Sequence, residues 1–351
     1  MSHSSRQTGI AAPAAAFGPA NTVRHEVTRM TARRARALDA ALRAGAALLA
    51  IAALAGAASG AAVAAATPAS SACAQTSQYA LKACRASAQS DAYTSLGKCA
   101  NIAVSGQRKR CQQDASAELA DAQSLCDAQN DARDSDCARL GPAPYEPRID
   151  PANFVTTIDN PWFPLRPGTT FVYEGQTSNG LEHSEFAVTR NTRVIAGVAC
   201  VEVRDRVWTD GVLTEDTLDW FAQDRNGNVW YFGENTHELE DGLISTIDGS
   251  FRAGVDGDKP GIVMEAHPAV GDFYRQEFSL GNAEDLAEVA ALDESASVPA
   301  GSYEHCLRTR ETSPLEPEVL EDKLYASGVG NILTVDVITG ERVALLRIIS
   351  E

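Results

Sequence analysis

Six of the eight cysteines are placed symmetrically about residue 105. Their spacings of 11, 15, 12, 15 and 11 residues read the same from either end, because the two positions of each pair add to 210. Spacings of 11 and 15 residues are close to three and four helical turns, so each helix would carry its thiols on one face. The pattern therefore predicts two antiparallel helices over residues 73–140, turning near Ser105 and Gly106. It also predicts three nested disulfides, Cys73–Cys137, Cys84–Cys126 and Cys99–Cys111.

The segment that carries these cysteines is rich in Ala, Gln, Ser and Asp and has only scattered large apolar residues. Two helices with so few apolar contacts would not stay paired by burial alone. Each disulfide is expected to offset this by constraining the unfolded chain, by roughly 2 to 4 kcal/mol. The hairpin is thus predicted to be stapled covalently.

A basic stretch followed by an uncharged one marks residues 1–66 as a signal peptide region. Four arginines between Arg33 and Arg43 precede Ala44–Ala66, and Met30 is a candidate true start. Ala64 and Ala66 make a small-residue cleavage site. The alternative is an uncleaved membrane anchor, since the apolar run is long enough to span. With cleavage, no stable membrane span would remain, and the disulfides then predict a secreted or periplasmic protein.

The chain is strongly acidic. Its formal net charge is −17, and removal of residues 1–66 would take away seven Arg, one Asp and one Glu, which leaves −22. Such a charge disfavours nucleic acid and anionic membranes as partners. An apolar small molecule, a lipid or an envelope protein remains as the expected partner.

A second domain begins after a Pro-rich linker over residues 141–149. Residues 150–351 alternate polar and apolar positions, and turn dipeptides interrupt them at Asn179-Gly180, Asp210-Gly211, Asn226-Gly227, Asp241-Gly242, Asp248-Gly249 and Thr339-Gly340. These dipeptides are hairpin signals. The prediction is an all-β main domain, a large curved antiparallel sheet of roughly eight to eleven strands shaped as a half-barrel or a sandwich. About 200 residues can bury a full core without staples.

The alternation assigns side chains to the two faces of individual strands. Within residues 199–208, Val201, Val203 and Asp205 point to the core face and Cys200 to the other. Within residues 303–310, the same rule places His305 inward and Cys306 outward. Because both cysteines are assigned to the polar face, a fourth disulfide, Cys200–Cys306, is predicted for an oxidising compartment.

Four segments of the second domain resemble a group of secreted bacterial β-rich proteins without assigned function. The segments are Ile158–Leu165 (IDNPWFPL), Pro167–Gly175 (PGTTFVYEG), Asp224–Glu234 (DRNGNVWYFGE) and Tyr325–Gly330 (YASGVG). The resemblance covers about residues 145–345. That group is distantly similar to the strongly curved LolA-like folds that carry lipoproteins, so the resemblance implies a curved antiparallel sheet. It implies no catalytic residues.

Candidate site residues fall in two sets. Asp205, His305, Trp220 and Trp230 are candidates for lining a ligand cavity, although each can also be read as an ordinary core residue. Asp256, Asp258, Glu265 and His267 lie in the long irregular stretch 253–271 and could bind calcium or zinc, although the stretch can also be read as a loop that caps the sheet. No other cofactor is expected.

Common enzymatic motifs are absent from the sequence, including Gly-x-Ser-x-Gly, His-Glu-x-x-His and the glycine-rich phosphate loops. The leading expectation is therefore non-catalytic binding of an apolar or amphiphilic ligand on the concave face of the sheet. Two alternatives stay open. One is an envelope hydrolase that uses carboxylates of the 253–271 loop and of the strand Glu215–Asp219. The other is a structural or adhesion module with a solid core.

Overall fold

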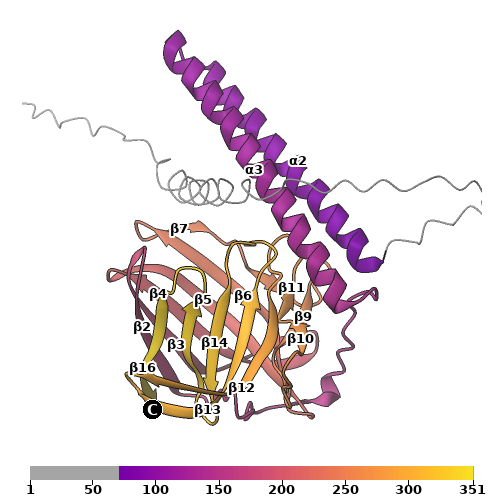
Figure 1. Cartoon of the computed structure of the whole chain (residues 1–351), viewed down its shortest axis with the longest axis vertical. Helices are drawn as coiled ribbons and strands as arrows, with labels where there is room; N and C mark the ends of the chain where they lie inside the picture. The colour runs from indigo at the N-terminus through magenta and orange to yellow at the C-terminus, as the bar shows by residue number, and fades with distance from the viewer. Residues whose placement is uncertain (1–70, 351) are drawn as a thin grey trace, which may run out of the picture. The chain divides into compact units, whose positions relative to one another are not determined.

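Two long helices open the part of the chain that the structure describes. The computed structural model describes residues 71–350, so the predicted signal peptide and the candidate start at Met30 lie outside it. The helices are α2 (Ala72–Ala100) and α3 (Ser105–Leu140), joined by a four-residue turn (Figure 1). Within residues 71–350, no helix combines the length and the apolar character needed to cross a membrane.

Disulfides and small residues hold the two helices together. Cys73–Cys137, Cys84–Cys126 and Cys99–Cys111 are all bonded, which confirms the three predicted hairpin disulfides. Between them the seam is thin: Ala80, Ala92 and Ala115 are buried. A polar contact also crosses the seam, because the Ser77 hydroxyl donates to Asn130 Oδ1 at 3.0 Å. The small apolar area agrees with the expectation that covalent staples replace a core.

The rest of the described chain is one antiparallel sheet of 16 strands. Eleven strands have six residues or more and five have two to four. The prediction of eight to eleven strands therefore matches the number of long strands and omits the short ones. The strands are β1 (Phe154–Val155), β2 (Thr169–Thr177), β3 (Gly180–Ile195), β4 (Val198–Thr209), β5 (Val212–Asp224), β6 (Val229–Glu240), β7 (Leu243–Thr246), β8 (Phe251–Arg252), β9 (Lys259–Met264), β10 (Phe273–Arg275), β11 (Glu277–Phe278), β12 (Leu286–Val298), β13 (Gly301–Thr312), β14 (Glu321–Ala326), β15 (Gly330–Asp336) and β16 (Arg342–Ser350). A short 3-10 helix, Pro151–Asn153, precedes β1.

The sheet is nearly closed and barrel-shaped (Figure 1). The strand order is β10-β12-β13-β14-β15-β16-β2-β3-β4-β5-β6-β9-β11. Its two ends, β10 and β11, are consecutive in the chain, and β16 pairs between β15 and β2. The predicted fold class, a curved all-β domain after a disulfide-laddered helical hairpin, is confirmed.

Local turn chemistry explains where the hairpins form. Five of the six glycine dipeptides named above fall between strands, and the sixth, Asn179-Gly180, ends on the first residue of β3. At Asp210-Gly211 the φ angles are +50° and +80°, and at Asp241-Gly242 they are +53° and +77°. Two-residue hairpin turns require positive φ at both central positions, which Asp tolerates and Gly adopts freely.

Buried apolar residues form two clusters on opposite faces of the sheet. Val201 and Val203 belong to the larger, interior cluster, whereas Cys200 and Trp220 belong to a smaller one with Phe232. This arrangement shows that the predicted Cys200–Cys306 disulfide is wrong. Both thiols are free and buried, Cys306 packs in the interior cluster, and the strands β4 and β13 are not neighbours in the sheet.

The predicted inward position of His305 is also wrong. The β12–β13 ladder shifts register between Ala291 and Glu294 and again between Glu294 and Ala296, and His305 has a φ of +55°. Its side chain is 81% exposed and its Nδ1 lies 2.5 Å from Asp293 Oδ1. A β-bulge adds a residue to one strand and so breaks the alternation on which the prediction relied.

Helix α3 contacts the sheet through an enclosed ion pair. The Arg133 guanidinium binds both carboxylate oxygens of Glu284, at 2.7 to 3.2 Å, and the two side chains are only 6% and 2% exposed. Nearby, the Gln129 side chain donates to the Leu315 carbonyl at 2.9 Å. Arg139 pairs with Glu288 at 2.8 Å. These contacts tie the hairpin to the turn between β11 and β12, to β12 itself and to the connection between β13 and β14.

Candidate ligand-binding cavity

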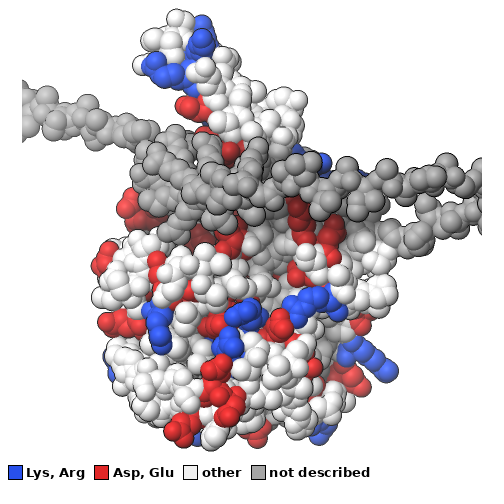
Figure 2. All heavy atoms as spheres, in the orientation of Figure 1, with Lys and Arg blue, Asp and Glu red and all other residues white. Residues whose placement is uncertain are grey.

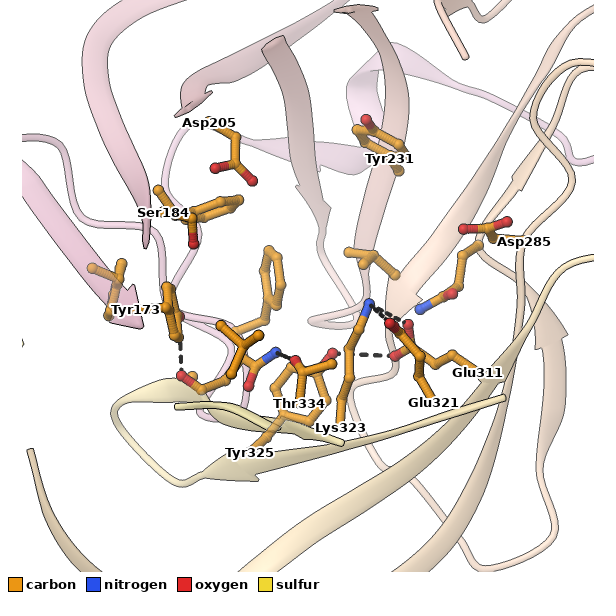
Figure 3. Close-up of a pocket in the computed structure, with 18 of the residues that line it drawn as sticks. Tyr173, Ser184, Asp205, Tyr231, Asp285, Glu311, Glu321, Lys323, Tyr325 and Thr334 are labelled. Carbon is orange, nitrogen blue, oxygen red and sulfur yellow. Dashed lines mark hydrogen bonds and ion pairs between the residues drawn. The ribbon is translucent and has the colours of Figure 1, made fainter. Parts of the chain in front are cut away.

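The interior of the sheet contains a cavity of about 500 Å³ (Figure 3). Strands from all around the sheet contribute to its lining, together with the segment that precedes β2. The lining residues are Phe163, Pro164, Leu165, Phe171, Tyr173, Thr177, Asn179, Glu182, Ser184, Phe186, Asp205, Phe221, Tyr231, Val263, Gln276, Glu277, Asp285, Glu311, Glu321, Lys323, Tyr325, Val329, Gly330, Asn331, Thr334, Asp336, Glu341 and Val343.

Strand alternation places these side chains inside. Strand β3 contributes Glu182, Ser184 and Phe186, each two residues from the next, and β14 contributes Glu321, Lys323 and Tyr325 in the same way. Side chains with period two share a face of a strand. Each of these strands therefore lines the cavity with polar groups toward one end of the triplet and an aromatic ring at the other.

Aromatic rings form a continuous apolar part of the lining. The ring of Phe163 lies 5.4 Å from that of Phe221 and 6.3 Å from that of Phe186, measured between centroids. Tyr231 stacks on Phe221 at 4.8 Å with an interplanar angle of 19°. Rings in such contact present both faces and edges to whatever occupies the adjacent space.

The remaining lining is strongly acidic. Eight of the lining residues are Asp or Glu, whereas Lys323 is the one cation among them. The Lys323 ammonium is already paired, at 2.8 Å from Glu311 Oε2 and 3.6 Å from Glu321 Oε2. Asp336 and Glu341 accept backbone N–H groups instead. Within residues 71–350, no ion pair is formed by the other four acids, which are Glu182, Asp205, Glu277 and Asp285.

Asp205 is the acid with the least compensation. Its Oδ1 is buried without a hydrogen-bond partner among the described residues, and Figure 3 shows the carboxyl group directed into the open space. Burial, and then the nearby Glu215 carboxylate, raise the pKa of Asp205 to about 7. A backbone N–H at Arg206 opposes the shift. The site thus holds a carboxyl group with too few hydrogen-bond donors around it to stabilise its charged form.

The other unpaired acids behave in the same way. Burial raises the pKa of Glu182 and of Asp285, and raises the pKa of Glu277 well above its ordinary value. For Glu182 the neighbouring Glu321 adds to the effect. Acids in a low-dielectric site hold protons unless a positive charge compensates them.

Tyr231 joins two further acids next to the cavity. Its hydroxyl oxygen lies 2.6 Å from Asp219 Oδ1 and 2.9 Å from Glu234 Oε2. A phenol has one proton to donate, so both hydrogen bonds form together only when one carboxyl group is protonated. Burial raises the pKa of Asp219 well above its usual range and that of Glu234 to about 7.

Of the four residues predicted to line a ligand cavity, only Asp205 does so in the main cavity. Trp220 faces the opposite side of the sheet, where Arg193 lies 4.3 Å above its ring. Trp230 packs against the same outer cluster and donates from Nε1 to Asp224 at 3.0 Å. His305 is exposed, as described above.

The predicted metal ligands lie apart. Asp256 and Asp258 line a smaller cavity of about 250 Å³ beside Trp220. Glu265 does not line it; burial, with a contribution from Asp272, raises the pKa of Glu265 to about 7. His267 is exposed. Over residues 71–350, no three His, Cys, Asp or Glu side chains are grouped so that they could hold a metal ion.

Sequence reasoning missed most of the cavity. Tyr173, Glu311, Lys323 and Tyr325 were not identified as candidates. Their spacing carried a usable signal, since Glu321, Lys323 and Tyr325 alternate along β14. Polar residues on one face of a strand ordinarily predict that this face is exposed to solvent. The same rule therefore assigns the polar residues of this cavity to the outer face of the sheet.

Comparisons with known proteins add little to this picture. No protein-family model matches the chain, and no curated protein matches it. Among solved structures, it is similar to a candidate lipoprotein from Parabacteroides distasonis, with 14% sequence identity and a TM-score of 0.31. The match covers 54% of this chain and 98% of that one. This likeness is too low to inform function, so the specific family resemblance described above stays a prediction.

Proposed function

We propose that this protein is a non-catalytic binding protein that holds a small amphiphilic ligand inside its nearly closed sheet. The observation that carries the proposal is the interior cavity of about 500 Å³ with aromatic rings on one part of its wall and carboxyl groups on another. Ligand sites in proteins are mostly concave, apolar and supplied with a few polar groups, with volumes of roughly 300 to 1,000 Å³.

The packing of the rest of the domain supports a ligand role for this space. Protein interiors are close-packed, and voids larger than a water molecule are few. A structural or adhesion module would be expected to fill the same volume with side chains. Here the inward positions on β3 and β14 carry Ser184 and Lys323 beside open space (Figure 3).

The mixed lining favours an amphiphilic ligand over a purely apolar one. An apolar molecule would fit the rings of Phe163, Phe171 and Phe186, but it would leave buried groups such as Asp205 Oδ1 without a partner. Unsatisfied buried polar groups are costly. A ligand with one polar end would satisfy both parts of the wall.

The three hairpin disulfides are typical of a protein that works in an oxidising compartment. We infer a secreted or periplasmic location, as the sequence predicts. A free small molecule in that compartment would reach the cavity without crossing the cytoplasmic membrane.

The hydrolase alternative receives less support from the same geometry. It requires carboxylates of the 253–271 loop to meet those of Glu215–Asp219. Asp256 and Asp258 instead line the smaller cavity, where Asp219 is not among the lining residues. Asp219 is engaged by Tyr231.

Native mass spectrometry of the protein isolated from its own compartment tests the proposal. We expect a small molecule to copurify and to leave on mild activation. In Ser184→Trp, an indole at the inward position of β3 should fill part of the cavity and abolish copurification. The matched control is Ser295→Trp, at an exposed position of β12, which should bind as the wild type does.

The proposal fails if no molecule copurifies and none of the amphiphiles described below binds. It also fails if Ser184→Trp, shown to be folded by its circular dichroism, retains full binding.

A further inference from the structure

The geometry points to an organic cation, an amine with an apolar body, as the class of ligand that this cavity selects. The inference rests on the function proposed above and goes beyond it by assigning the charge of the ligand. Its ammonium group would lie against the carboxyl group of Asp205, which lines the cavity. Its apolar part would lie along the aromatic rings.

The charge balance of the lining carries the inference. Eight acids face one cation, and that cation is already shared by Glu311 and Glu321. Removing a charge from water is costly unless an opposite charge is supplied at close range. A positively charged ligand would supply further positive charge to this wall, where Glu182, Asp205, Glu277 and Asp285 form no ion pair among residues 71–350.

An unpartnered atom supports the inference independently. Asp205 Oδ1 is buried, accepts no hydrogen bond and belongs to a carboxyl group that points into the cavity (Figure 3). An ammonium group has three donors and no acceptor, which matches a wall of acceptors that lacks donors. Hydrogen bonds between charged partners are about twice as strong as neutral ones.

The aromatic rings fit the same class of ligand. Cations are attracted to the faces of Tyr and Phe rings. The stacked pair Phe221 and Tyr231 lines the cavity together with Asp205 and Glu277. An amine with an alkyl or aryl body would therefore find charge compensation and apolar contact in one space.

Other charge classes fit less well. A metal ion would need grouped ligands, and the described residues contain no group of three that could hold one. An anionic amphiphile, such as a fatty acid, would add a further acid to a wall that already holds eight acids and a single cation. Acidic side chains also predominate over basic ones on the visible surface of the sheet domain (Figure 2), which would favour the approach of cations.

Three probes with the same alkyl chain test the inference. Decylamine, decanol and decanoate differ only in the charge of the head group at neutral pH. Isothermal titration calorimetry with the protein isolated from its own compartment should give the tightest binding for decylamine, roughly tenfold or more above decanol. Decanoate should show no measurable binding.

A pair of variants locates the charge that matters. Asp205→Asn removes one carboxylate from the cavity, and it should weaken decylamine binding by roughly tenfold while leaving decanol binding unchanged. Asp248→Asn removes the same charge from an exposed position outside the cavity and should change neither. The control separates local contact from the overall field of an acidic protein.

The outcomes distinguish the two proposals. If decanol or decanoate binds as tightly as decylamine, the cavity is a binding site but does not select cations, and the inference is overturned alone. If Asp205→Asn and Asp248→Asn weaken decylamine equally, long-range charge explains the preference and the assigned contact is wrong. If none of the three probes binds and nothing copurifies, both proposals fall.

Discussion

Asp205 shows how one buried acid couples the cavity to the stability of the whole domain. Its pKa is about 7 in the folded protein, against an ordinary value of 3.8. Glu215 and Glu182 raise the pKa, and Lys323 lowers it. Below about pH 3 the group is protonated in both states and has no effect on stability. As the pH rises toward 7, the unfolded state ionises while the folded state stays protonated, so the free energy of unfolding falls.

We therefore expect Asp205→Asn to be more stable than the wild type above about pH 7 and equal to it at about pH 3, because the amide does not ionise in either state. Denaturant unfolding of ligand-free protein at both pH values measures the difference. Equal stability of the two proteins at the higher pH would show that the carboxyl group is solvated. Asp248→Asn, at an exposed position, should show no such pH-dependent gain.

At the scale of single residues, alternation predicted some positions and failed at others for a physical reason. Val201, Val203 and Asp205 face inward as expected, because the β4–β5 ladder is regular from Val201 to Val207. His305 lies outward because a bulge interrupts β13. A bulge is a property of two paired strands, so it cannot be predicted from the sequence of one strand.

Among the elements, the hairpin depends on its disulfides more than the sheet depends on any single contact. Replacing both Cys84 and Cys126 by Ser removes the middle staple and should lower the free energy of unfolding of the hairpin by roughly 2 to 4 kcal/mol. The far-ultraviolet circular dichroism of the helices should be lost at a lower temperature. The near-ultraviolet signal of the sheet aromatics should be unchanged. Coincident melting of variant and wild type would contradict a stabilising role for this disulfide.

Elements were predictable where turn chemistry is local. The hairpin turns at Asp210-Gly211 and Asp241-Gly242 were predicted from two residues each, because those residues tolerate positive φ. The short strands β1, β8 and β11 have two residues each and exist only because a neighbouring strand offers them hydrogen bonds. A pattern of two residues has no period, and the sequence therefore could not indicate them.

For the molecule as a whole, the Arg133–Glu284 pair is the contact that most firmly ties the hairpin to the sheet. Arg133→Ala would leave the Glu284 carboxylate buried without its partner, and should cost roughly 3 to 5 kcal/mol in unfolding free energy. The control is Arg85→Ala, in an ion pair whose side chains are half exposed, with an expected loss of at most about 1 kcal/mol.

Chemical denaturation followed at both helix and aromatic wavelengths measures these losses. The double variant Arg133→Met with Glu284→Leu should recover much of the lost stability, because it removes both charges together. A loss in Arg133→Ala no larger than that in Arg85→Ala would show that the pair is hydrated in solution.

The cavity itself could not be predicted from the sequence. Its wall combines Tyr173 of β2, Tyr231 of β6, Glu311 of β13 and Lys323 of β14, which are up to 150 residues apart in the chain. Which strands face one another across the interior follows from the order and closure of the sheet, and local propensity does not encode that order. The predicted Cys200–Cys306 bond failed for the same reason, since β4 and β13 are not neighbours.

The position of β16 between β15 and β2 has a consequence for the timing of assembly. During synthesis, β2 emerges before every other long strand, and its partner β16 emerges after all the others. Until that moment β2 and β15 each present an open edge, and open edges invite pairing with other chains. The sheet can therefore be completed only after β16, the last strand of the chain, has been synthesised. A chain that stalls or is cleaved before β16 would keep both edges open and would be prone to aggregate.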